Sequence, residues 1–362
     1  MTQTSAETAV HNLLMHCAGA QAGQRVLIAY EPETFGYFDA EVVDSVAREA
    51  TKLGLHVDRT NVGFEAQDPR FSPDLMEQMR AADVVVFLAR LGDQLRFSEM
   101  PDTTTIVNSY TLTSELLNSG FATAHYQAFC ELKAAVDRVV AQADEIELTC
   151  PAGTSVRGRP DLGNIPSSDT TLRRFPVSVF SPVPAEGFSG KVALGGFLTG
   201  TGSRYYDDYT VEFDSQVFAL LNHGRLDGFE GASADVAKAE AQYDRVSAMF
   251  GIDRNFVHSW HAGIHPGCGF PWDMRRDYDR WGGAAFGNPR ILHFHTCGAY
   301  APGEISWNLF DATIEVDGVA LWEQGVFRAD RLPEGREILA RYPCAAQVFA
   351  APDRNIGLSG TS

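Results

Sequence analysis

The spacing of apolar residues divides the chain into two stretches of different character. Up to about residue 147, short apolar runs alternate with segments whose apolar positions recur every three or four residues. Gln24–Tyr30 and Val84–Leu88 have the continuous hydrophobicity of buried strands, whereas Phe38–Leu53 and Tyr126–Ala143 follow the period of a helix. This alternation predicts an α/β domain over residues 1–147 with a parallel sheet covered by helices.

The second stretch, residues 148–362, is predicted to be an α+β domain rich in antiparallel strands. Its β-prone runs are short and are separated by turns that contain glycine and proline. The predicted strands are Glu145–Thr149, Val177–Phe180, Lys191–Leu194, Tyr209–Phe213 and Ile291–His295. Ser233–Phe250 has the only long helical pattern here. No glycine-rich phosphate-binding motif follows a strand of the first domain, so nucleotide binding is not indicated.

The excess of acidic residues argues against nucleic acids and anionic membranes as binding partners. The chain has 29 Lys and Arg against 47 Asp and Glu, a formal net charge of −18, whereas nucleic acids and anionic membranes attract basic surfaces. The longest apolar run, Val84–Ala89, is far shorter than a membrane span. The first ten residues also lack the apolar core of a signal peptide. We therefore expect a cytoplasmic protein that binds a small molecule, without nucleic-acid or membrane partners.

Histidines are the unusual feature of the second stretch, since five of the ten lie within residues 258–295. A helix around His261 and His265 is disfavoured by the glycine and proline among them, so both are expected on one face of an extended segment. His293 and His295 alternate on a predicted strand, which places their imidazoles on one face roughly 6–7 Å apart. Such clustering predicts a metal site in the second domain.

Carboxylates that follow these histidines extend the candidate ligand set. Glu304 and Asp311 lie within twenty residues of the histidine strand. Two histidines and one carboxylate form a facial set that leaves positions open for substrate and oxygen, and mixed nitrogen and oxygen donors suit Fe(II), Mn(II) or Zn(II). Cys268 and Cys297 also lie near histidines, which leaves a Cys–His nucleophile as an alternative, although cysteines of this kind are more often buried and structural.

Six short motifs follow one another in an order typical of a known family. They are Gly23–Ile28, Ala81–Val85, Thr149–Ser155, His261–Ile264, Gly287–Asn288 and Thr313–Gly318. The series resembles the aminopeptidase T superfamily over about residues 20–330. That superfamily includes leucyl-aminopeptidase-like metallopeptidases and a non-peptidase branch similar to 2,5-dihydroxypyridine 5,6-dioxygenase.

The resemblance implies ligands position by position. His261 matches a histidine that binds iron in the ring-cleaving branch, and His293 or His295 lies on the strand that bears a further metal histidine. Val177 stands where the peptidases have a glutamate, and Glu304 occupies the first position of a late His-x-Asp ligand pair. With both patterns incomplete, the expected set is His261, one histidine of the strand and Glu304.

These observations predict a mononuclear non-heme iron oxygenase that cleaves or oxidises a small aromatic or heteroaromatic ring. His265 is the expected acid/base, because an imidazole exchanges protons near neutral pH. The alternative is a metal-dependent, aminopeptidase-like hydrolase of peptide or amide bonds that uses Zn or Mn. A binding protein that has lost its catalytic centre is a third hypothesis. The resemblance also implies a homodimer.

Overall fold

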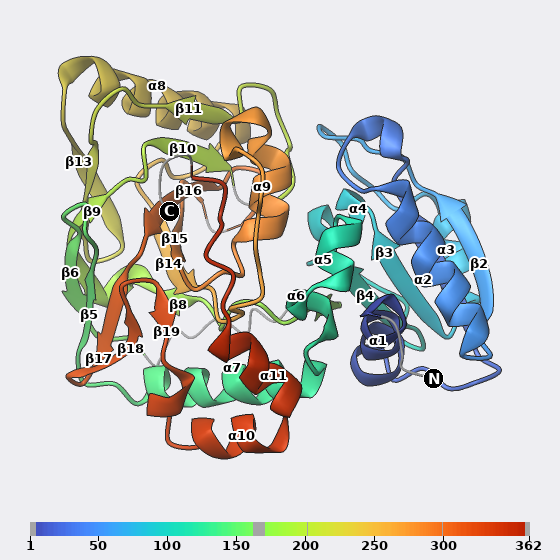
Figure 1. Cartoon of the computed structure of the whole chain (residues 1–362). Helices are drawn as coiled ribbons and strands as arrows, with labels where there is room; N and C mark the ends of the chain where they lie inside the picture. The colour runs from blue at the N-terminus through green and yellow to red at the C-terminus, as the bar shows by residue number, and fades with distance from the viewer. Residues whose placement is uncertain (1–4, 162–170, 201, 299, 359–362) are drawn as a thin grey trace.

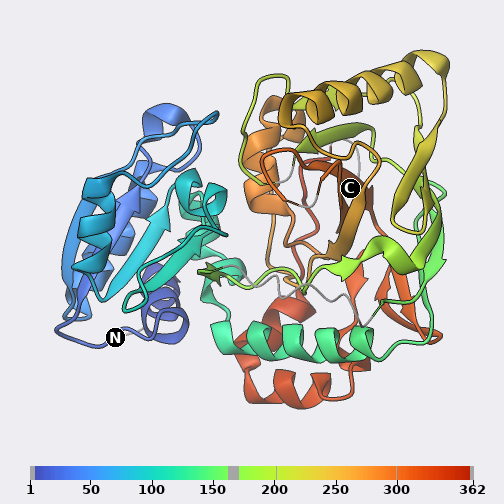
Figure 2. The ribbon, with the colours of Figure 1, turned by 180° about the vertical axis from the view of Figure 1, so that it is seen from behind.

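The computed structural model describes residues 5–161, 171–200, 202–298 and 300–358, which form two lobes (Figures 1 and 2). An α/β lobe with a parallel sheet is followed by a larger α+β lobe with antiparallel sheets, as the sequence predicts. Among the described residues, no helix combines the length and the apolar character needed to cross a membrane.

The first lobe contains a five-stranded parallel sheet in the order β2-β1-β3-β4-β7. The strands are β1 (Arg25–Tyr30), β2 (His56–Asn61), β3 (Val84–Leu88), β4 (Thr105–Ser109) and β7 (Arg173–Phe175). Every residue of β3 is buried, because α2 packs on one face of the sheet and α3 on the other. The helical segments here are α1 (Ser5–His11), the π-helical η1 (Asn12–Cys17), α2 (Ala40–Lys52), α3 (Pro73–Arg80), α4 (Arg90–Gln94), α5 (Ser114–Asn118) and α6 (Gly120–Thr123).

The second lobe consists of two antiparallel sheets and their helices. The six-stranded sheet has the order β11-β10-β16-β15-β14-β8, and the eight-stranded sheet has the order β13-β12-β9-β6-β5-β17-β18-β19. The first comprises β8 (Val183–Pro184), β10 (Phe197–Gly200), β11 (Thr210–Glu212), β14 (Val257–Ala262), β15 (Ile291–Thr296) and β16 (Ile305–Phe310). The second comprises β5 (Ile146–Thr149), β6 (Ser155–Gly158), β9 (Phe188–Ala193), β12 (Phe218–Asn222), β13 (Arg225–Glu230), β17 (Thr313–Val316), β18 (Val319–Glu323) and β19 (Val326–Phe327). The helices are α7 (Tyr126–Ala141), α8 (Ser233–Phe250), α9 (Tyr278–Ala285), α10 (Gly335–Arg341) and α11 (Pro343–Ala350).

Along β14 and β15, hydrophobic and polar side chains alternate, so the six-stranded sheet has a hydrophobic face and a polar face there. Trp260 of β14 and Phe294 of β15 are fully buried in the same hydrophobic cluster as residues of the eight-stranded sheet. Their neighbours in sequence point to the opposite face of the six-stranded sheet, because strand side chains alternate. The core between the two sheets therefore holds these strands in place and directs their histidines away from it.

Most predicted elements are confirmed, and one predicted strand is wrong. The helix over Ser233–Phe250 has the predicted bounds. Val177–Phe180 forms only an isolated bridge, between Val179 and Gly263. Proline lacks the N–H that a strand ladder requires, and Pro176 and Pro182 flank this segment.

The predicted boundary near residue 147 falls inside β5 (Ile146–Thr149), shortly after α7 ends at Ala141. Beyond this point the chain returns once to the first lobe, where β7 pairs with β4. Helix α7 instead packs against the core of the second lobe and lies beside α10 (Figure 1). The two lobes therefore exchange elements on both sides of the predicted boundary.

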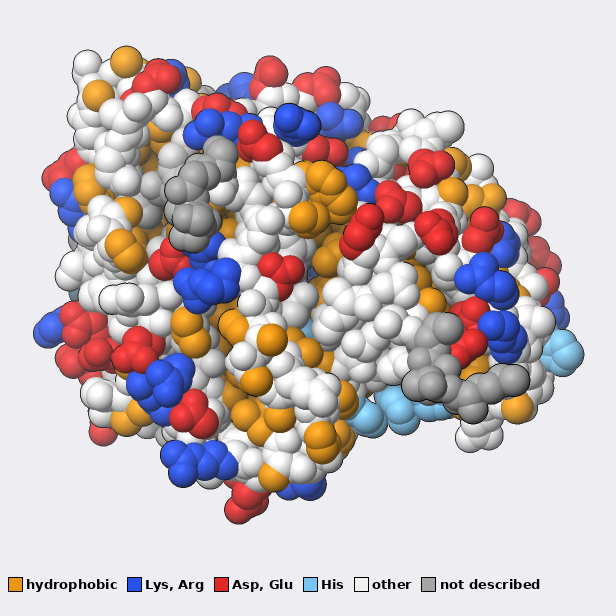
Figure 3. All heavy atoms as spheres, viewed as in Figure 1, with side chains coloured by type: hydrophobic (Ala, Val, Ile, Leu, Met, Phe, Trp, Pro, Cys, Tyr) orange, Lys and Arg blue, Asp and Glu red, His pale blue; other side chains and the backbone are white. Residues whose placement is uncertain are grey.

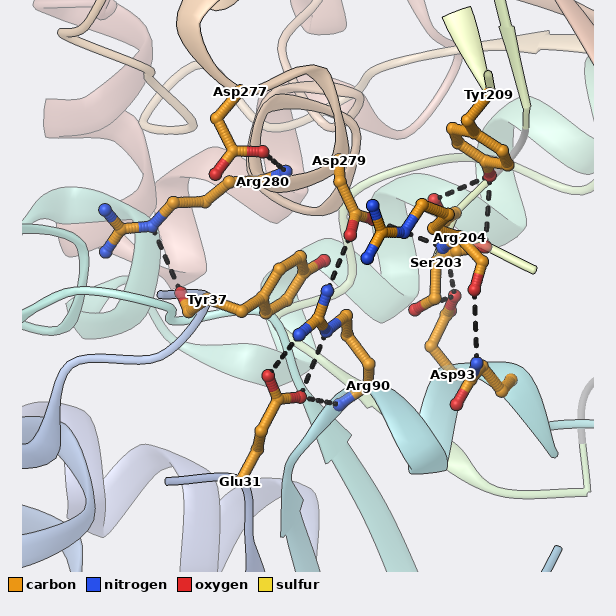
Figure 4. Close-up of polar contacts among 12 residues, drawn as sticks. Glu31, Tyr37, Arg90, Asp93, Ser203, Arg204, Tyr209, Asp277, Asp279 and Arg280 are labelled. Atoms are coloured by element: carbon orange, nitrogen blue, oxygen red, sulfur yellow. Dashed lines mark hydrogen bonds and ion pairs between the residues drawn. The ribbon is translucent and has the colours of Figure 1, made fainter. Parts of the chain in front are cut away.

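A network of buried charged residues joins the two lobes. Arg90 of α4 lies between Glu31, which follows β1, and Asp279 of α9 (Figure 4). Its Nη1 donates to Asp279 at 2.6 Å, and its Nε donates to Glu31 at 3.1 Å. Asp93 of the same helix accepts from the Ser203 N–H at 3.1 Å. A buried charge is tolerated when it is paired on several sides, so this network holds α4 against the second lobe.

Candidate metal centre

Three histidines from two neighbouring strands meet on the polar face of the six-stranded sheet. His261 of β14 is directly opposite His293 of β15 in the antiparallel register, and His295 lies two residues further along β15. All three side chains are buried. The prediction that His293 and His295 share one face is confirmed, and the register brings His261 to that same face.

The imidazole Nε2 atoms of the three residues converge. The His261 Nε2 atom is 2.7 Å from the His293 Nε2 atom and 3.1 Å from the His295 Nε2 atom. One nitrogen from each ring lies within 4.8 Å of the other two. Phe286 stacks on His293 with ring centroids 4.5 Å apart, which fixes the plane of that imidazole.

The outer nitrogens determine which tautomers are present. The His261 Nδ1 atom is 2.9 Å from the Phe180 carbonyl oxygen, and the His295 Nδ1 atom is 2.8 Å from the Glu304 Oε1 atom. Because a carbonyl and a carboxylate only accept, both Nδ1 atoms carry the proton. In the neutral rings the Nε2 lone pairs then face each other, an arrangement that a cation between them would stabilise.

Burial keeps the His261 and His293 rings neutral. It lowers the pKa of His261 and of His293 well below the ordinary 6.5, and the positive charge that neighbouring imidazoles would carry lowers both further. A neutral imidazole with an inward lone pair is the form that binds metal ions. The three residues therefore fit a metal ion with three nitrogen ligands.

Glu304 supports the centre from its outer side. It accepts from His295, and the Arg96 Nη2 atom lies 3.7 Å from its second carboxylate oxygen. Arg96 in turn donates from Nη1 to the Asp93 backbone oxygen at 2.8 Å. A carboxylate that accepts from the outer nitrogen of a ligand histidine orients the ring and raises its basicity. Through Arg96, this support reaches from the histidines to the first lobe.

A cavity of about 450 Å³ opens on the histidine cluster between the two lobes. This volume is within the usual range for small-molecule sites, roughly 300–1,000 Å³. Much of the wall is aromatic, with side chains of Phe97, Tyr110, Phe121, Tyr126, Phe180, Phe286 and Tyr300. The cavity therefore offers a flat apolar molecule extensive contact beside the metal centre.

The structure brings some of the predicted site residues together and places others elsewhere. His261 and both strand histidines meet, while Glu304 contacts His295 on the side away from the cluster. Asp311 forms an ion pair with Arg290 at 2.7 Å. The arrangement offers three histidines, where the sequence predicts two histidines and a carboxylate.

His265 is not brought to the cluster. Strand β14 ends at Ala262, so the alternation that would align residues 261 and 265 stops there, and the prediction of a shared face is wrong. The fully buried His265 ring stacks on Phe129 at 3.7 Å and meets Phe121 edge-on. Burial lowers its pKa to about 3, so the ring carries no extra proton near neutral pH.

Two residues that line the cavity, Arg174 and Tyr110, were not singled out from the sequence, and His258 was noted only as a member of the histidine cluster. Arg174 reaches the cavity from β7, Tyr110 from the segment after β4, and His258 from the start of β14. The Tyr110 hydroxyl donates to Asp93 at 2.9 Å. Arg174 and Tyr110 belong to no motif, and only the packing of the lobes places them beside His258.

Comparisons with known proteins agree with this fold. No family model and no curated protein sequence matches the chain. The solved structure of 2,5-dihydroxypyridine dioxygenase from Pseudomonas putida KT2440 aligns with a TM-score of 0.56 and 14% identity, over 92% of this chain and 99% of that one. The chain has the fold of this dioxygenase. AmpT from Thermus thermophilus aligns with a TM-score of 0.49 and 12% identity, over 90% and 99% of the two chains. The alignment with the dioxygenase confirms, at the level of the fold, the resemblance seen in the sequence.

Proposed function

We propose that this protein is a mononuclear non-heme iron enzyme that uses O₂ to cleave or oxidise a small aromatic or heteroaromatic ring. The observation that carries the proposal is the convergence of three buried imidazoles at the aromatic cavity. The fold is also that of a protein named 2,5-dihydroxypyridine dioxygenase. In ring cleavage, one bond between ring atoms breaks and both oxygen atoms of O₂ enter the product.

His261, His293 and His295 would hold the ion through their Nε2 atoms. When bound, Fe(II) supplies the redox chemistry that the reaction of O₂ with an aromatic molecule requires. Three protein ligands would leave coordination positions for a substrate and O₂. The proposed set has no carboxylate, so Glu304 acts by holding the His295 proton on Nδ1 and keeping the Nε2 lone pair directed inward.

Residues of the wall position the substrate and move protons. Phe286, already stacked on His293, and Tyr110 confine a flat ring and exclude water from the side of the histidines. His258 also lines the cavity, and its Nδ1 atom lies 2.8 Å from the Ser259 hydroxyl. Burial lowers the pKa of His258, so near neutral pH it can accept a proton from a substrate hydroxyl group. We assign to it the acid/base role that the sequence suggested for His265.

One observation favours a second candidate, a metal-dependent hydrolase. Three histidines with one open position form a ligand set that catalytic zinc sites use to activate water. In this case the substrate would be a peptide or amide, and His258 would accept the proton of the attacking water.

The two functions are separated by the metal and by oxygen consumption. The protein is purified without an affinity resin, its metal content is measured, and samples loaded with Fe(II) or Zn(II) are assayed with dihydroxylated benzenes and pyridines and with aminoacyl anilides. About one iron per chain with oxygen consumption supports the oxygenase. Anilide hydrolysis by the zinc form, without oxygen consumption by the iron form, contradicts it and supports the hydrolase.

A further inference from the structure

Arg174 is a cavity residue that the proposed reaction leaves without a role. Strand β7 adds to the edge of the first sheet with Arg174 opposite Asn108 of β4. From there the side chain lines the same cavity as His261 and His293.

Unlike Arg96 and Lys133, the Arg174 guanidinium of the cavity wall forms no direct ion pair with a described carboxylate, and Asp93, on which its charge acts at longer range, is already paired with Arg96. Arg96 interacts with Glu304 and Asp93, and Lys133 forms an ion pair with Asp137 at 2.8 Å. Within the described part of the chain, no carboxylate forms an ion pair with Arg174, and its buried Nε atom has no hydrogen-bond partner.

Charge around the cavity is opposite in sign to the charge of the whole chain. Its lining residues include four cations and two carboxylates, namely Arg96, Lys133, Arg173, Arg174, Asp93 and Glu304. The chain as a whole has a formal net charge of −18. A cationic cavity in an anionic protein attracts anions selectively to that cavity.

A partly buried guanidinium without a partner is unfavourable until a ligand supplies one. Removing a charged group from water carries a free-energy cost that a paired anion offsets. The planar fork of N–H donors on arginine matches the two oxygens of a carboxylate. The aromatic side chains of the same cavity accommodate a ring beside that carboxylate.

We propose that the substrate is a small aromatic carboxylate, whose carboxylate binds Arg174 while its ring lies between the aromatic side chains and faces the histidines. As a statement about the substrate, this rests on the proposed function. The binding itself requires only the cavity and Arg174. Arg174 is thus assigned as the residue that selects an anionic substrate.

The test compares benzoate with benzamide, a neutral molecule of nearly the same shape. Binding of each is measured by calorimetry on the full-length protein after treatment with a chelator, so that direct coordination of benzoate to a metal does not contribute. Wild-type protein is expected to bind benzoate at least about tenfold more tightly than benzamide, because a hydrogen-bonded ion pair is lost with the amide.

Variants assign the preference to Arg174. R174Q is expected to weaken benzoate binding at least about tenfold while benzamide binding changes less than about twofold, and R174K is expected to retain part of the preference. R157Q is the matched control, since Arg157 pairs with Glu147 on the exposed surface. Equal affinity of wild-type protein for the two probes, or undiminished benzoate binding by R174Q with native thermal stability, overturns the inference.

Failure of this inference is distinguishable from failure of the proposed function. Metal content and oxygen consumption are measured on wild-type protein and on R174Q, which should bind metal as wild type does. A preference for benzoate in a protein that consumes no oxygen supports the anion site and contradicts the oxygenase. Oxygen consumption with neutral diols, without a preference for benzoate, overturns the anion site alone.

Discussion

The protein contains two separate clusters of three histidines each, and only one cluster has the geometry of a metal site. His261, His293 and His295 are buried, with Nε2 atoms 2.7 and 3.1 Å apart. The other group, His11, His16 and His125, links α1 and η1 to the N-terminus of α7. There the rings meet by faces and edges, with centroids 4.1 and 4.9 Å apart. Figure 3 shows histidine side chains at the surface where the two lobes meet.

The difference lies in what the second nitrogen of each ring does. In the buried group, acceptors hold the Nδ1 protons of His261 and His295, so that Nε2 is directed inward. In the surface group, the His125 Nδ1 atom accepts from the Gln127 N–H at the start of α7, and the His16 side chain is exposed. Proximity alone therefore does not make a metal site, because the lone pairs must also be aimed and kept from water.

Removing a ligand from the buried group should have the largest effect. His261→Ala leaves two ligands and is expected to weaken metal binding by more than about 100-fold, beyond the 10- to 100-fold typical of losing a supporting residue. Elemental analysis after gel filtration of Fe(II)- or Zn(II)-loaded protein measures this. His16→Ala is the matched control, and equal metal loss in both variants would remove the distinction between the two groups.

Removing the support of the buried group should have an intermediate effect. Glu304→Ala frees the His295 ring and is expected to weaken metal binding about 10- to 100-fold. Glu304→Gln, which keeps an acceptor at this position, should lose less. Competition with a metal-binding dye measures both affinities. Indistinguishable losses in the two variants would show that the charge of Glu304 matters and its hydrogen bond does not.

Burial of neutral histidines should make stability depend on pH. Between the ordinary pKa of 6.5 and its folded value of about 3, His265 binds a proton only in the unfolded chain. The stability it contributes is complete above about pH 6.5 and falls as the pH decreases, by about 1.4 kcal/mol per pH unit. In His265→Phe the decrease should be shallower by this amount. Urea unfolding of metal-free protein at several pH values measures the slope, and an unchanged slope in His265→Phe would contradict this assignment.

The smallest effect is expected at the surface group. His16→Ala removes an exposed ring and should change the free energy of unfolding by less than about 0.5 kcal/mol, since surface substitutions away from special features are nearly neutral. Metal content should be that of wild type. A larger loss of stability, measured by urea unfolding, would show that stacking on His125 supports the junction of the two lobes.

The sequence was sufficient to predict the features that depend on the spacing of nearby residues, such as helices, strands and the faces of each. The alternation of β15 alone places His293 and His295 on one face, and the helix over Ser233–Phe250 follows from its apolar period and the glycine that ends it. The fold class follows from the same periodicities, because each period buries one face of its element. The three converging histidines, His261, His293 and His295, were among the predicted ligands.

The tertiary structure determined which residues reach the site, because this depends on strand register and on contact between the lobes. The pairing of β14 with β15 brings His261 to the strand histidines, and the end of β14 at Ala262 sends His265 into a hydrophobic layer. Glu304, just before β16, contacts His295 because β15 and β16 are adjacent, and no spacing reveals which nitrogen of the ring it contacts. Arg174 reaches the cavity only because β7 returns to the first sheet. Contacts between residues distant in sequence depend on how whole elements pack, so they leave no local pattern to read.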